Sequence, residues 1–171
     1  MADLYEMQLR DAKRLIDLYF ALFPKIKEWQ THTVNRASRE CKLRNAFGYE
    51  MSFFEVHKWD SRKKGWTLGS DAKPAIAFLP RDTGAAMLKE ALLRIAPRTL
   101  PGELIASTHD SVLCEVTTGR LEAVASILQT ELERPVPELG GLSIPVELKA
   151  GPAWHESTME PYEAPQLLVT N

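Results

Sequence analysis

The 171-residue chain is poor in cysteine and lacks long apolar runs. Its two cysteines, Cys41 and Cys114, are too few for a disulfide framework and lack metal-site spacing, so we expect reduced thiols in an intracellular protein. No stretch of about 18 apolar residues occurs, and acidic residues lie in segment 1–10, where a secretory signal needs a basic and then an apolar run. We therefore expect neither export nor a membrane partner.

The sequence also lacks several catalytic signature motifs and any segment of biased composition. The sequence has no Walker A motif, no GxGxxG, no HExxH, no GxSxG and no internal repeat, so several common enzyme classes lose support. It has no low-complexity block, and its 44% hydrophobic and 26% charged content is ordinary for a folding chain. The length predicts one domain.

Charge is unevenly distributed, although the net charge is only -2. Residues 36–73 contain nine Lys or Arg against five Asp or Glu, whereas residues 103–171 contain three against eleven. A basic stretch followed by an acidic one suits a protein that binds phosphates on one surface and holds metal or faces solvent on another. Uneven solvated surface charge explains the same pattern.

Two helices are predicted in the first quarter of the chain. Apolar residues recur at mostly helical spacing over residues 3–23, and Pro24 ends or kinks that helix. A second helix is predicted over residues 25–44, with one apolar face. Its flank is basic through Arg36, Arg39, Lys42 and Arg44.

A β-hairpin is predicted after the turn signal at residues 45–48. Residues 49–59 and 66–68 carry loosely alternating aromatic and β-branched side chains, and DSRKKG between them forms a basic tip.

Three further elements are predicted in the second half of the chain. A compact apolar helix covers residues 85–95, after Pro80 and before Pro97. An amphipathic helix capped by Thr118 covers residues 119–133, and a final strand covers residues 144–150. We expect a loose tail over residues 157–171.

Residues 103–116, ELIASTHDSVLCEV, contain two apolar runs that His109 and Asp110 interrupt. The pattern is typical of a tight hairpin, in which Asp is tolerated in the turn conformation, so a carboxylate lies at the bend. The order of the predicted elements indicates an α+β fold with an antiparallel sheet and flanking helices.

The His-Asp turn inside a hydrophobic hairpin resembles the metal-binding palm hairpin of family A DNA polymerases, which carry His-Asp-Glu there. Four more segments resemble the family in the same order. YFALFPKIKEW resembles its YF..YP segment, NAFGYEMSFFEV its fG hairpin, KPAIAFLPRDTGAAMLKEALLRI its RAAiN.PiQGtAADiiK helix, and IPVELKAGPAWHE its closing v....G.nW.e. The resemblance implies that residues 1–156 form the C-terminal palm and fingers part of such an enzyme, a partial polymerase palm.

The resemblance implies template-dependent nucleotidyl transfer with two Mg²⁺ ions, with DNA primer-template and dNTP as partners. Asp110 is the implied catalytic metal ligand, since hard cations want oxygen ligands and a turn aspartate projects both oxygens at a fixed point. His109 matches a position that lies against the primer terminus in the family. Taken alone, the two residues equally suit an ordinary turn.

Two departures concern the carboxylates of the hairpin. Ser111 stands where the family usually has Glu, so the corner loses a charge. The single-subunit phage-type RNA polymerases have His-Asp-Ser here, so Ser111 need not abolish chemistry. Glu115 matches the second acid of the hairpin and suits a structural or solvated role better than a ligand role.

The resemblance also implies DNA contacts in the helix before the hairpin. Lys73 and Arg81 stand where the family has Arg and Gln, and Ala77 replaces an Asn that reads the minor groove. Arg81 suits a phosphate contact, a minor-groove acceptor or a surface position. The remaining candidate DNA-binding residues are Arg36, Arg39 and Arg44.

The family's first catalytic aspartate and its nucleotide-closing fingers helix have no counterpart in this sequence. Because positioning and charge stabilisation are the mechanism, we expect the isolated chain to be inactive and to need an upstream polymerase half as a separate chain. A cytoplasmic location in a bacterial or phage-infected cell is expected. Two alternatives stay open: a catalytically inactive DNA-binding fragment that also uses residues 62–64, and a single-subunit RNA polymerase relative.

Overall fold

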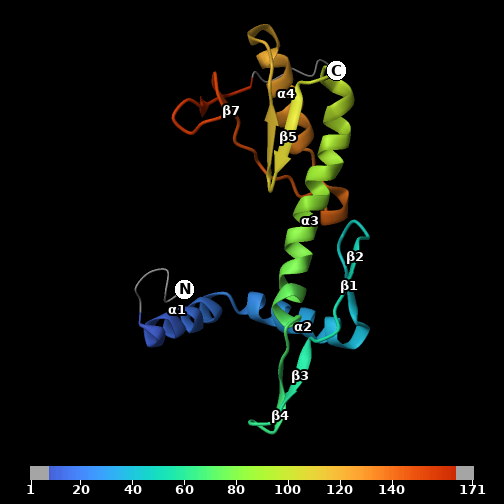
Figure 1. The fold of residues 1–171 in the computed structure, drawn as a ribbon, viewed down its shortest axis with the longest axis vertical. Coiled ribbons are helices and arrows are strands. Elements are labelled where there is room, and N and C mark those ends of the chain that lie inside the picture. Colours follow the sequence, from blue (N-terminus) through green and yellow to red (C-terminus); the bar gives the residue numbers. More distant parts are fainter. Residues whose placement is uncertain (1–7, 165–171) are drawn as a thin grey trace. The chain divides into compact units, whose positions relative to one another are not determined.

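The computed structural model describes residues 8–164 of the chain (Figure 1). The length predicted one domain, whereas the chain forms two compact units. Unit 1 extends to Leu79 and unit 2 begins at Pro80, so the division falls inside a helix. No helix in the described part combines the length and apolar character needed to cross a bilayer.

The described part of unit 1 starts with two consecutive helices, α1 (Leu9–Leu22) and α2 (Pro24–Glu40). Residues 3–7 of the first predicted helix lie outside the described residues. The predicted break at Pro24 is confirmed: proline stands at the first turn of α2, where its fixed φ suits a helix start and its missing N–H costs no helical bond. The predicted extension of this helix to residue 44 is wrong. Cys41 adopts a left-handed conformation, with φ 55°, and ends α2.

The residues after Cys41 form a hairpin that the residue pattern did not predict, although the resemblance of residues 45–56 to the family's fG hairpin implied one. Strand β1 (Lys42–Arg44) pairs antiparallel with β2 (Glu50–Ser52). The turn between them is held by buried Asn45, whose Oδ1 accepts the backbone N–H groups of Phe47 and Tyr49, both at 2.9 Å. The basic residues of β1 fit a helical flank as well as a strand, so periodicity alone does not separate the two.

The predicted hairpin with a basic tip is confirmed, but its predicted first strand over residues 49–59 is too long, because residues 50–52 belong to β2 of the other hairpin. Strand β3 (His57–Asp60) pairs antiparallel with β4 (Gly65–Leu68), and residues 61–64 form the tip.

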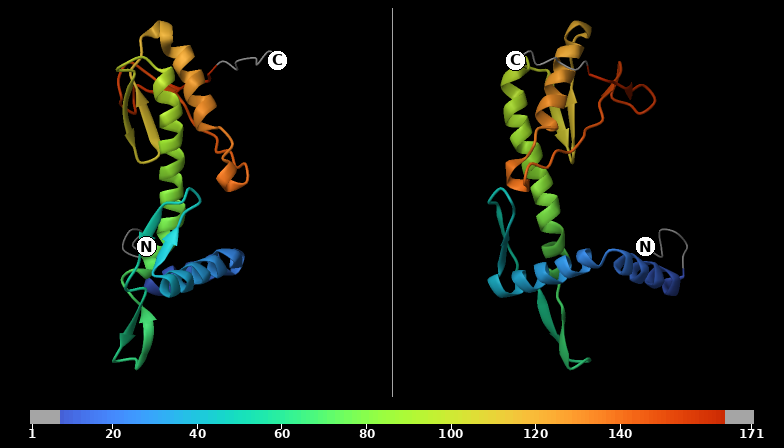
Figure 2. Two further views of the ribbon diagram at one scale, coloured as in Figure 1. Left: turned by 90° about the vertical axis from the view of Figure 1, so that its right-hand side faces the viewer. Right: turned by 180° about the vertical axis from the view of Figure 1, so that it is seen from behind.

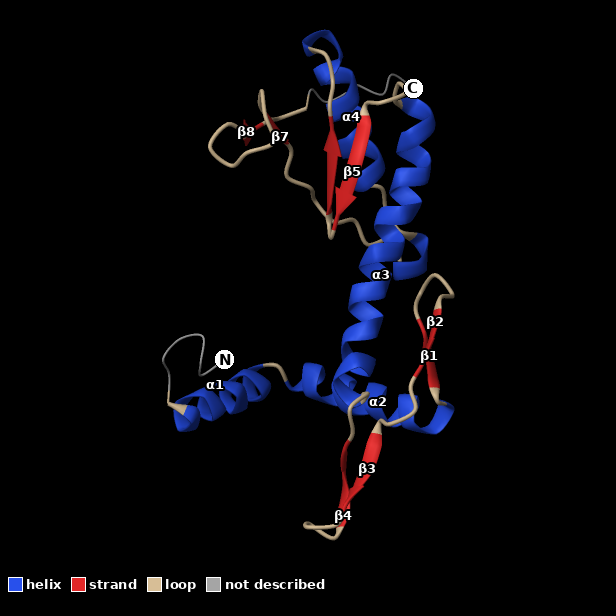
Figure 3. Cartoon of the chain, in the orientation of Figure 1, coloured by secondary structure: helices blue, strands red, loops and turns tan. Residues whose placement is uncertain are grey.

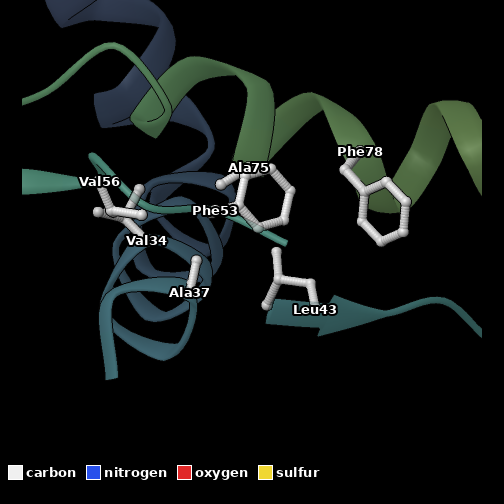
Figure 4. Packing of buried hydrophobic residues seen from close by; sticks show 7 residues of the cluster. All are labelled: Val34, Ala37, Leu43, Phe53, Val56, Ala75 and Phe78. Carbon is white, nitrogen blue, oxygen red and sulfur yellow. The ribbon is translucent and has the colours of Figure 1, made fainter. Parts of the chain in front are cut away.

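The core of unit 1 joins α2, β1, the segment between β2 and β3, and the start of α3 (Figure 4). The rings of Phe53 and Phe78 meet edge to face, with centroids 5.9 Å apart. The other members are small or branched side chains that fit around the two rings: Val34, Ala37, Leu43, Val56 and Ala75.

Helix α3 (Ala72–Ile95) is longer than predicted and contains Pro80. The predicted start at residue 85 is wrong, because the helix already begins at Ala72. A proline inside a helix loses one hydrogen bond and costs about 3 kcal/mol, but burial of Ala75 and Phe78 holds the preceding turns in place. The predicted end is confirmed, since a 3-10 turn (Ala96–Arg98) follows Ile95.

Unit 2 places a hairpin and a helix beside the last turns of α3. The hairpin consists of β5 (Leu104–Thr108) and β6 (Ser111–Cys114), as predicted. Helix α4 (Leu121–Leu132) runs alongside the end of α3 (Figure 2). Its predicted cap is wrong: Thr118 begins a 3-10 turn (Thr118–Arg120), and no side chain caps α4.

The last described part contains little regular structure. A 3-10 turn (Pro137–Leu139) follows α4, and the predicted strand over 144–150 is reduced to β7 (Lys149–Ala150). Strand β8 (Glu160–Pro161), within the segment for which we expect a loose tail, pairs with β7. Residues 165–171 of that tail lie outside the described residues.

The fold class is α+β, as predicted, and every strand pair is antiparallel. The described strands form four separate two-stranded ribbons instead of one sheet (Figure 3).

Candidate active site

The corner of the β5–β6 hairpin is a two-residue turn. Thr108 pairs with Ser111, which leaves His109 and Asp110 as the two turn residues. His109 adopts the left-handed conformation, with φ 54°, so His109 and not Asp110 absorbs the sharp bend. Histidine is among the few residues besides glycine that are enriched in this region.

The side chains at the corner face solvent. His109, Asp110 and Ser111 are all exposed. The Ser111 hydroxyl donates a hydrogen bond to the backbone carbonyl of Thr108 at 2.9 Å and thereby closes the turn. Ser111 therefore stabilises the corner, and Asp110 supplies its one carboxylate.

A buried ion pair holds the other end of the hairpin. Glu103, just before β5, accepts hydrogen bonds from Arg120 Nε at 3.0 Å and Nη2 at 3.1 Å, and from the Leu100 amide at 2.7 Å. The hydrogen bonds from Arg120 and from the Leu100 amide outweigh burial and lower the pKa of Glu103. The Glu115 amide also donates to the Glu103 carbonyl at 2.8 Å, so both strands are anchored at one residue.

A second buried carboxylate joins the two helices of unit 2. Glu131 of α4 accepts a hydrogen bond from Arg94 Nε at 2.9 Å and another from Arg98 Nη1. Burial raises the pKa of Glu131, but the hydrogen bonds from Arg94 and Arg98 outweigh it, so the pKa is lowered. The helices beside the hairpin are thus fixed by charged contacts as well as by apolar packing.

The two candidate DNA-binding residues of α3 are both exposed. Lys73 lies in the first turn of the helix and belongs to unit 1, and Arg81 follows Pro80 and belongs to unit 2. Arg81 thus shares its unit with the His109–Asp110 corner.

The three arginines of the basic flank differ in their surroundings. Arg39 pairs with Glu40 at 2.8 Å, and Arg44 donates to Glu50 through Nε at 2.8 Å. Arg36 is half-buried, and its buried Nε has no hydrogen-bond partner.

Glu50 receives a second cation from the same strand. Lys42 Nζ lies 3.1 Å from the Glu50 carboxylate. Hydrogen bonds from Arg44 and Lys42 lower the pKa of Glu50. The cationic charge of β1 is therefore partly neutralised within unit 1.

No group of three or more His, Cys, Asp or Glu side chains suited to hold a metal occurs among residues 8–164. Asp110 stands alone at the corner, and Glu115, beyond the end of β6, is exposed. Of the ligands that a hard divalent cation requires, the described chain therefore offers a single carboxylate here.

One feature of unit 1 was missed in the sequence. Trp59 of β3 and Trp66 of β4 stand directly opposite one another, with ring centroids 5.9 Å apart and planes at 80°. The signal was present, because the two tryptophans flank the basic tip symmetrically in WDSRKKGW.

Comparison with known protein families gives one match over most of the chain. The family model described as DNA polymerase family A matches residues 1–156.

Curated relatives agree with that match. The chain is 26% identical over 145 residues to a thermostable DNA polymerase I from Thermus thermophilus, covering 82% of this chain and 16% of that protein. It is 24% identical over 153 residues to DNA polymerase I from Deinococcus radiodurans, covering 86% of this chain and 15% of that protein. The chain thus spans about a sixth of the length of these relatives.

A solved structure has a similar fold. It is the POL domain of Pol1 from M. smegmatis in complex with DNA primer-template and dNTP. The TM-score is 0.66 at 15% identity, and the similarity covers 77% of this chain and 23% of that one.

Proposed function

Because the chain belongs to DNA polymerase family A, we propose that it supplies the palm hairpin of a DNA-directed DNA polymerase, with Asp110 as a ligand of the catalytic metal. The observation that carries the proposal is the exposed carboxylate of Asp110 at the corner between β5 and β6. That corner lies within the segment that the family model matches.

The donor chemistry of Asp110 fits Mg²⁺. No hydrogen bond from a described residue occupies the Asp110 side chain, so both oxygens remain available. Protein sites for Mg²⁺ commonly use only one or two carboxylates, with water and substrate phosphates as the remaining ligands. Asp110 would serve as a ligand in a two-Mg²⁺ site, where one ion would supply activation of the primer hydroxyl and the other neutralisation of charge on the triphosphate.

The other residues of the corner hold Asp110 in position. His109 absorbs the bend, and the Ser111 hydroxyl closes the turn. The proposal gives His109 a second role against the primer terminus, where its exposed ring is available for contact.

Exposed cations are proposed to bind the primer-template duplex through its phosphates. Lys73 and Arg81 are exposed on α3. Arg39 and Arg44 are engaged in exposed ion pairs, which contribute only about 0–1 kcal/mol and are readily exchanged for a phosphate contact. Arg36 is half-buried, with its Nε buried, and is proposed as a weaker contributor to the same contact.

An upstream polymerase half is proposed to complete the active site. The chain spans about a sixth of its relatives, and the β5–β6 ribbon has no third strand among the described residues. An isolated two-stranded ribbon is marginal in water, and its open edges favour pairing with another segment.

Helix α1 supports the same proposal. One side of the helix is an apolar stripe that is at least two-fifths exposed, formed by Leu15, Ile16, Leu18, Tyr19, Leu22 and Phe23. We propose that the upstream half covers this stripe.

The proposal is tested by primer extension with Mg²⁺, using the chain alone, an upstream half of a family A polymerase alone, and the two mixed. We expect extension only in the mixture. Asp110→Ala is expected to abolish the rescued activity, whereas the matched variant Glu115→Gln, which removes a neighbouring exposed carboxylate, is expected to retain most of it.

A readout besides activity is Mn²⁺ binding to the mixture, followed by paramagnetic relaxation. Loss of one bound ion with Asp110→Ala supports the ligand role. Robust extension by the purified chain alone, or full activity of the Asp110→Ala mixture, contradicts the proposal.

A second candidate is a DNA-binding fragment without catalysis. It is favoured by the single carboxylate at the corner together with the exposed cations on α3. Salt-dependent duplex binding that survives Asp110→Ala but falls with Lys73→Ala and Arg81→Ala, without rescue of extension, supports this function. The relatives described above are DNA polymerases, so the RNA polymerase alternative gains no support from them.

A further inference from the structure

The β3–β4 hairpin presents two large aromatic rings to solvent. Trp59 is 57% exposed and Trp66 is 70% exposed, although both belong to one cross-strand pair. A tryptophan pair of this kind usually lies against another element, because each ring buries a large apolar area in a folded core. Here the ribbon projects away from α2 within unit 1 (Figures 1 and 2). The edge of one tryptophan ring faces the plane of the other.

Four cations lie on the same hairpin, three of them at the tip next to the pair and Lys58 on the face of β3 opposite Trp59. Lys58 lies within β3, and Arg62, Lys63 and Lys64 form most of the tip. All four are exposed, and none forms an ion pair with an acidic side chain of the described chain.

The one carboxylate of the hairpin does not neutralise these cations. Asp60 Oδ1 accepts the backbone N–H groups of Arg62 at 2.9 Å and Lys63 at 3.3 Å. Asp60 thus folds the tip and leaves the cationic ends free to bind an anion. The cations of β1, by contrast, are paired with Glu50.

The base of the ribbon is held firmly, so the rings are presented on a fixed support. The Asp71 carboxylate accepts the amides of Phe54 at 2.8 Å and Glu55 at 3.0 Å. The His57 ring lies 3.0 Å from the Ser38 hydroxyl of α2.

Gly69 brings the end of β4 close to the start of β3. A Cβ at Gly69 would lie 2.1 Å from the Glu55 carbonyl oxygen, so only glycine allows this approach. The ribbon therefore projects from the core of unit 1 in one defined direction.

We propose that the β3–β4 hairpin is a binding site for single-stranded nucleic acid, with unpaired bases stacking on Trp59 and Trp66 and phosphates binding Arg62, Lys63 and Lys64. Exposed aromatic faces beside a cationic track are the two features that non-specific single-strand sites share. A duplex offers the same phosphates, but its bases are already stacked on one another. The single strand is therefore the preferred ligand.

This site is separate from the Asp110 corner and does not depend on the proposed function. It gives the chain a way to hold an unpaired strand whether or not the chain takes part in polymerisation.

The test measures binding of the full chain to fluorescein-labelled oligo-dT of about 12 nucleotides and to a blunt duplex of equal length, by fluorescence anisotropy at several salt concentrations. We expect the single strand to bind more tightly than the duplex and to quench tryptophan fluorescence. Trp59→Ala with Trp66→Ala is expected to weaken oligo-dT binding about tenfold or more, because each stacked base contributes appreciably. Phe54→Ala, which removes an 87% exposed aromatic outside the ribbon, is the matched control and is expected to bind like the parent chain.

Variants of the tip test the phosphate contacts. Lys64 has φ 48°, so it is replaced by asparagine, which tolerates that conformation, in the triple variant Arg62→Ser, Lys63→Ser, Lys64→Asn. This variant is expected to lower the slope of log affinity against log salt by about two, since each single-strand phosphate contact contributes about 0.7.

Two further measurements separate binding from folding of the ribbon. Trp59→Phe with Trp66→Phe keeps the cross-strand aromatic pair and is expected to retain most of the affinity that the alanine variant loses. Photocrosslinking of the unmodified chain to an oligonucleotide containing 5-iodouracil is expected to label Trp59 or Trp66 in mass spectrometry.

Equal affinity for duplex and single strand with no effect of the tryptophan variants overturns the proposal. Crosslinks confined to residues outside 57–68 overturn it as well. Absence of oligo-dT binding at low salt, combined with tryptophan-dependent binding of an acidic protein, assigns the hairpin to a protein partner instead.

Discussion

At the scale of single residues, the corner of the β5–β6 hairpin divides its work between residues that shape the turn and one residue that presents a charge. The sequence suggested two neighbouring functional side chains, those of His109 and Asp110, followed by a serine in place of a carboxylate. In the fold, His109 takes the left-handed turn position, Ser111 bonds back to Thr108, and Asp110 alone points a charged group outward without a partner from the described chain. The neighbours of Asp110 are therefore needed for its position.

The conformation of His109 leads to a prediction that distinguishes turn from chemistry. His109→Gly is expected to change the free energy of unfolding by less than about 1 kcal/mol, because glycine adopts a positive φ freely but loses more backbone entropy on folding. His109→Val is expected to destabilise the chain by about 1–2 kcal/mol, since a β-branched residue is strained there. Urea denaturation measures both.

The glycine variant also tests the functional role of His109. If the imidazole acts only in the turn, the glycine variant supports primer extension with the upstream half as well as the parent chain does. If the ring contacts the primer terminus, as we propose, the glycine variant loses activity while its stability is kept.

At the scale of elements, charged contacts tie each unit together where apolar area is limited. Helix α4 is short, and its last turn meets the end of α3 through the buried carboxylate of Glu131. Two arginines from α3 and the turn after it donate to that carboxylate. Such a contact makes the stability of unit 2 depend on pH.

The lowered pKa of Glu131 fixes the sign of that dependence. The ionised Glu131 carboxylate makes its full contribution to stability above the unfolded pKa of about 4.3. That contribution is lost as the pH falls through the lower pKa of the folded state. Glu131→Gln is expected to destabilise unit 2 by about 2 kcal/mol at pH 7.

Parallel urea denaturation of the parent chain and the Glu131→Gln variant from pH 7 to pH 3 measures the difference. The difference in unfolding free energy between the two chains is expected to shrink over the acidic part of this range. Glu138→Gln, an exposed carboxylate in the turn after α4, serves as the control and should leave the profile unchanged. A constant difference down to pH 3 contradicts the assignment.

Substitution by alanine is expected to change stability in opposite directions at two glycines. A Cβ at Gly151 would lie 2.0 Å from the Thr158 carbonyl oxygen, so Gly151→Ala is expected to disrupt the β7–β8 ribbon at a cost of about 1–3 kcal/mol. A Cβ at Gly84, inside α3, meets nothing within 4 Å, so Gly84→Ala is expected to stabilise the helix by about 0.5–1 kcal/mol.

Thermal unfolding measures the global effect of both substitutions, and hydrogen exchange localises the first. The Tyr162 amide donates to the Leu148 carbonyl at 2.9 Å in the β7–β8 ribbon, and its exchange is expected to accelerate in Gly151→Ala. Equal stability of the Gly151→Ala variant and the parent chain would mean that the two segments do not approach this closely.

At the scale of the whole molecule, a chain that spans about a sixth of its relatives forms two compact units but leaves apolar surface uncovered. Leu18 and Leu22 of α1 are 54% and 65% exposed and lie one helical turn apart. Surface of this kind is unusual on one side of a helix in a free monomer.

We predict that Leu18→Gln with Leu22→Gln weakens association with the upstream polymerase half about a hundredfold, because burial of each leucine contributes about 1.5–3 kcal/mol. Lys13→Gln with Arg14→Gln, on the polar side of α1, is the matched control and is expected to associate normally. Analytical ultracentrifugation of the mixtures measures both affinities. Unchanged association of the leucine variant would place the contact elsewhere on the chain.

The amino-acid sequence alone determined the features that depend on neighbouring residues. The break at Pro24, the tip between β3 and β4, and the corner at His109 and Asp110 follow from proline geometry and from polar residues between apolar runs. The α+β class followed from the order of the predicted elements, and the family resemblance rested on five segments, which include Pro24 and the corner at His109 and Asp110 but not the tip between β3 and β4.

The tertiary structure decided the outcome at positions where local sequence signals compete. Helix α3 continues through Pro80 because Ala75 and Phe78 are buried in the core, and residues 42–44 leave the helix because Leu43 packs into that same core. Burial of apolar side chains outweighs a local preference of a few tenths to about 3 kcal/mol, and it depends on residues distant in sequence. The exposure of Trp59, Trp66 and Asp110 is decided in the same way, because it depends on which other segments reach them.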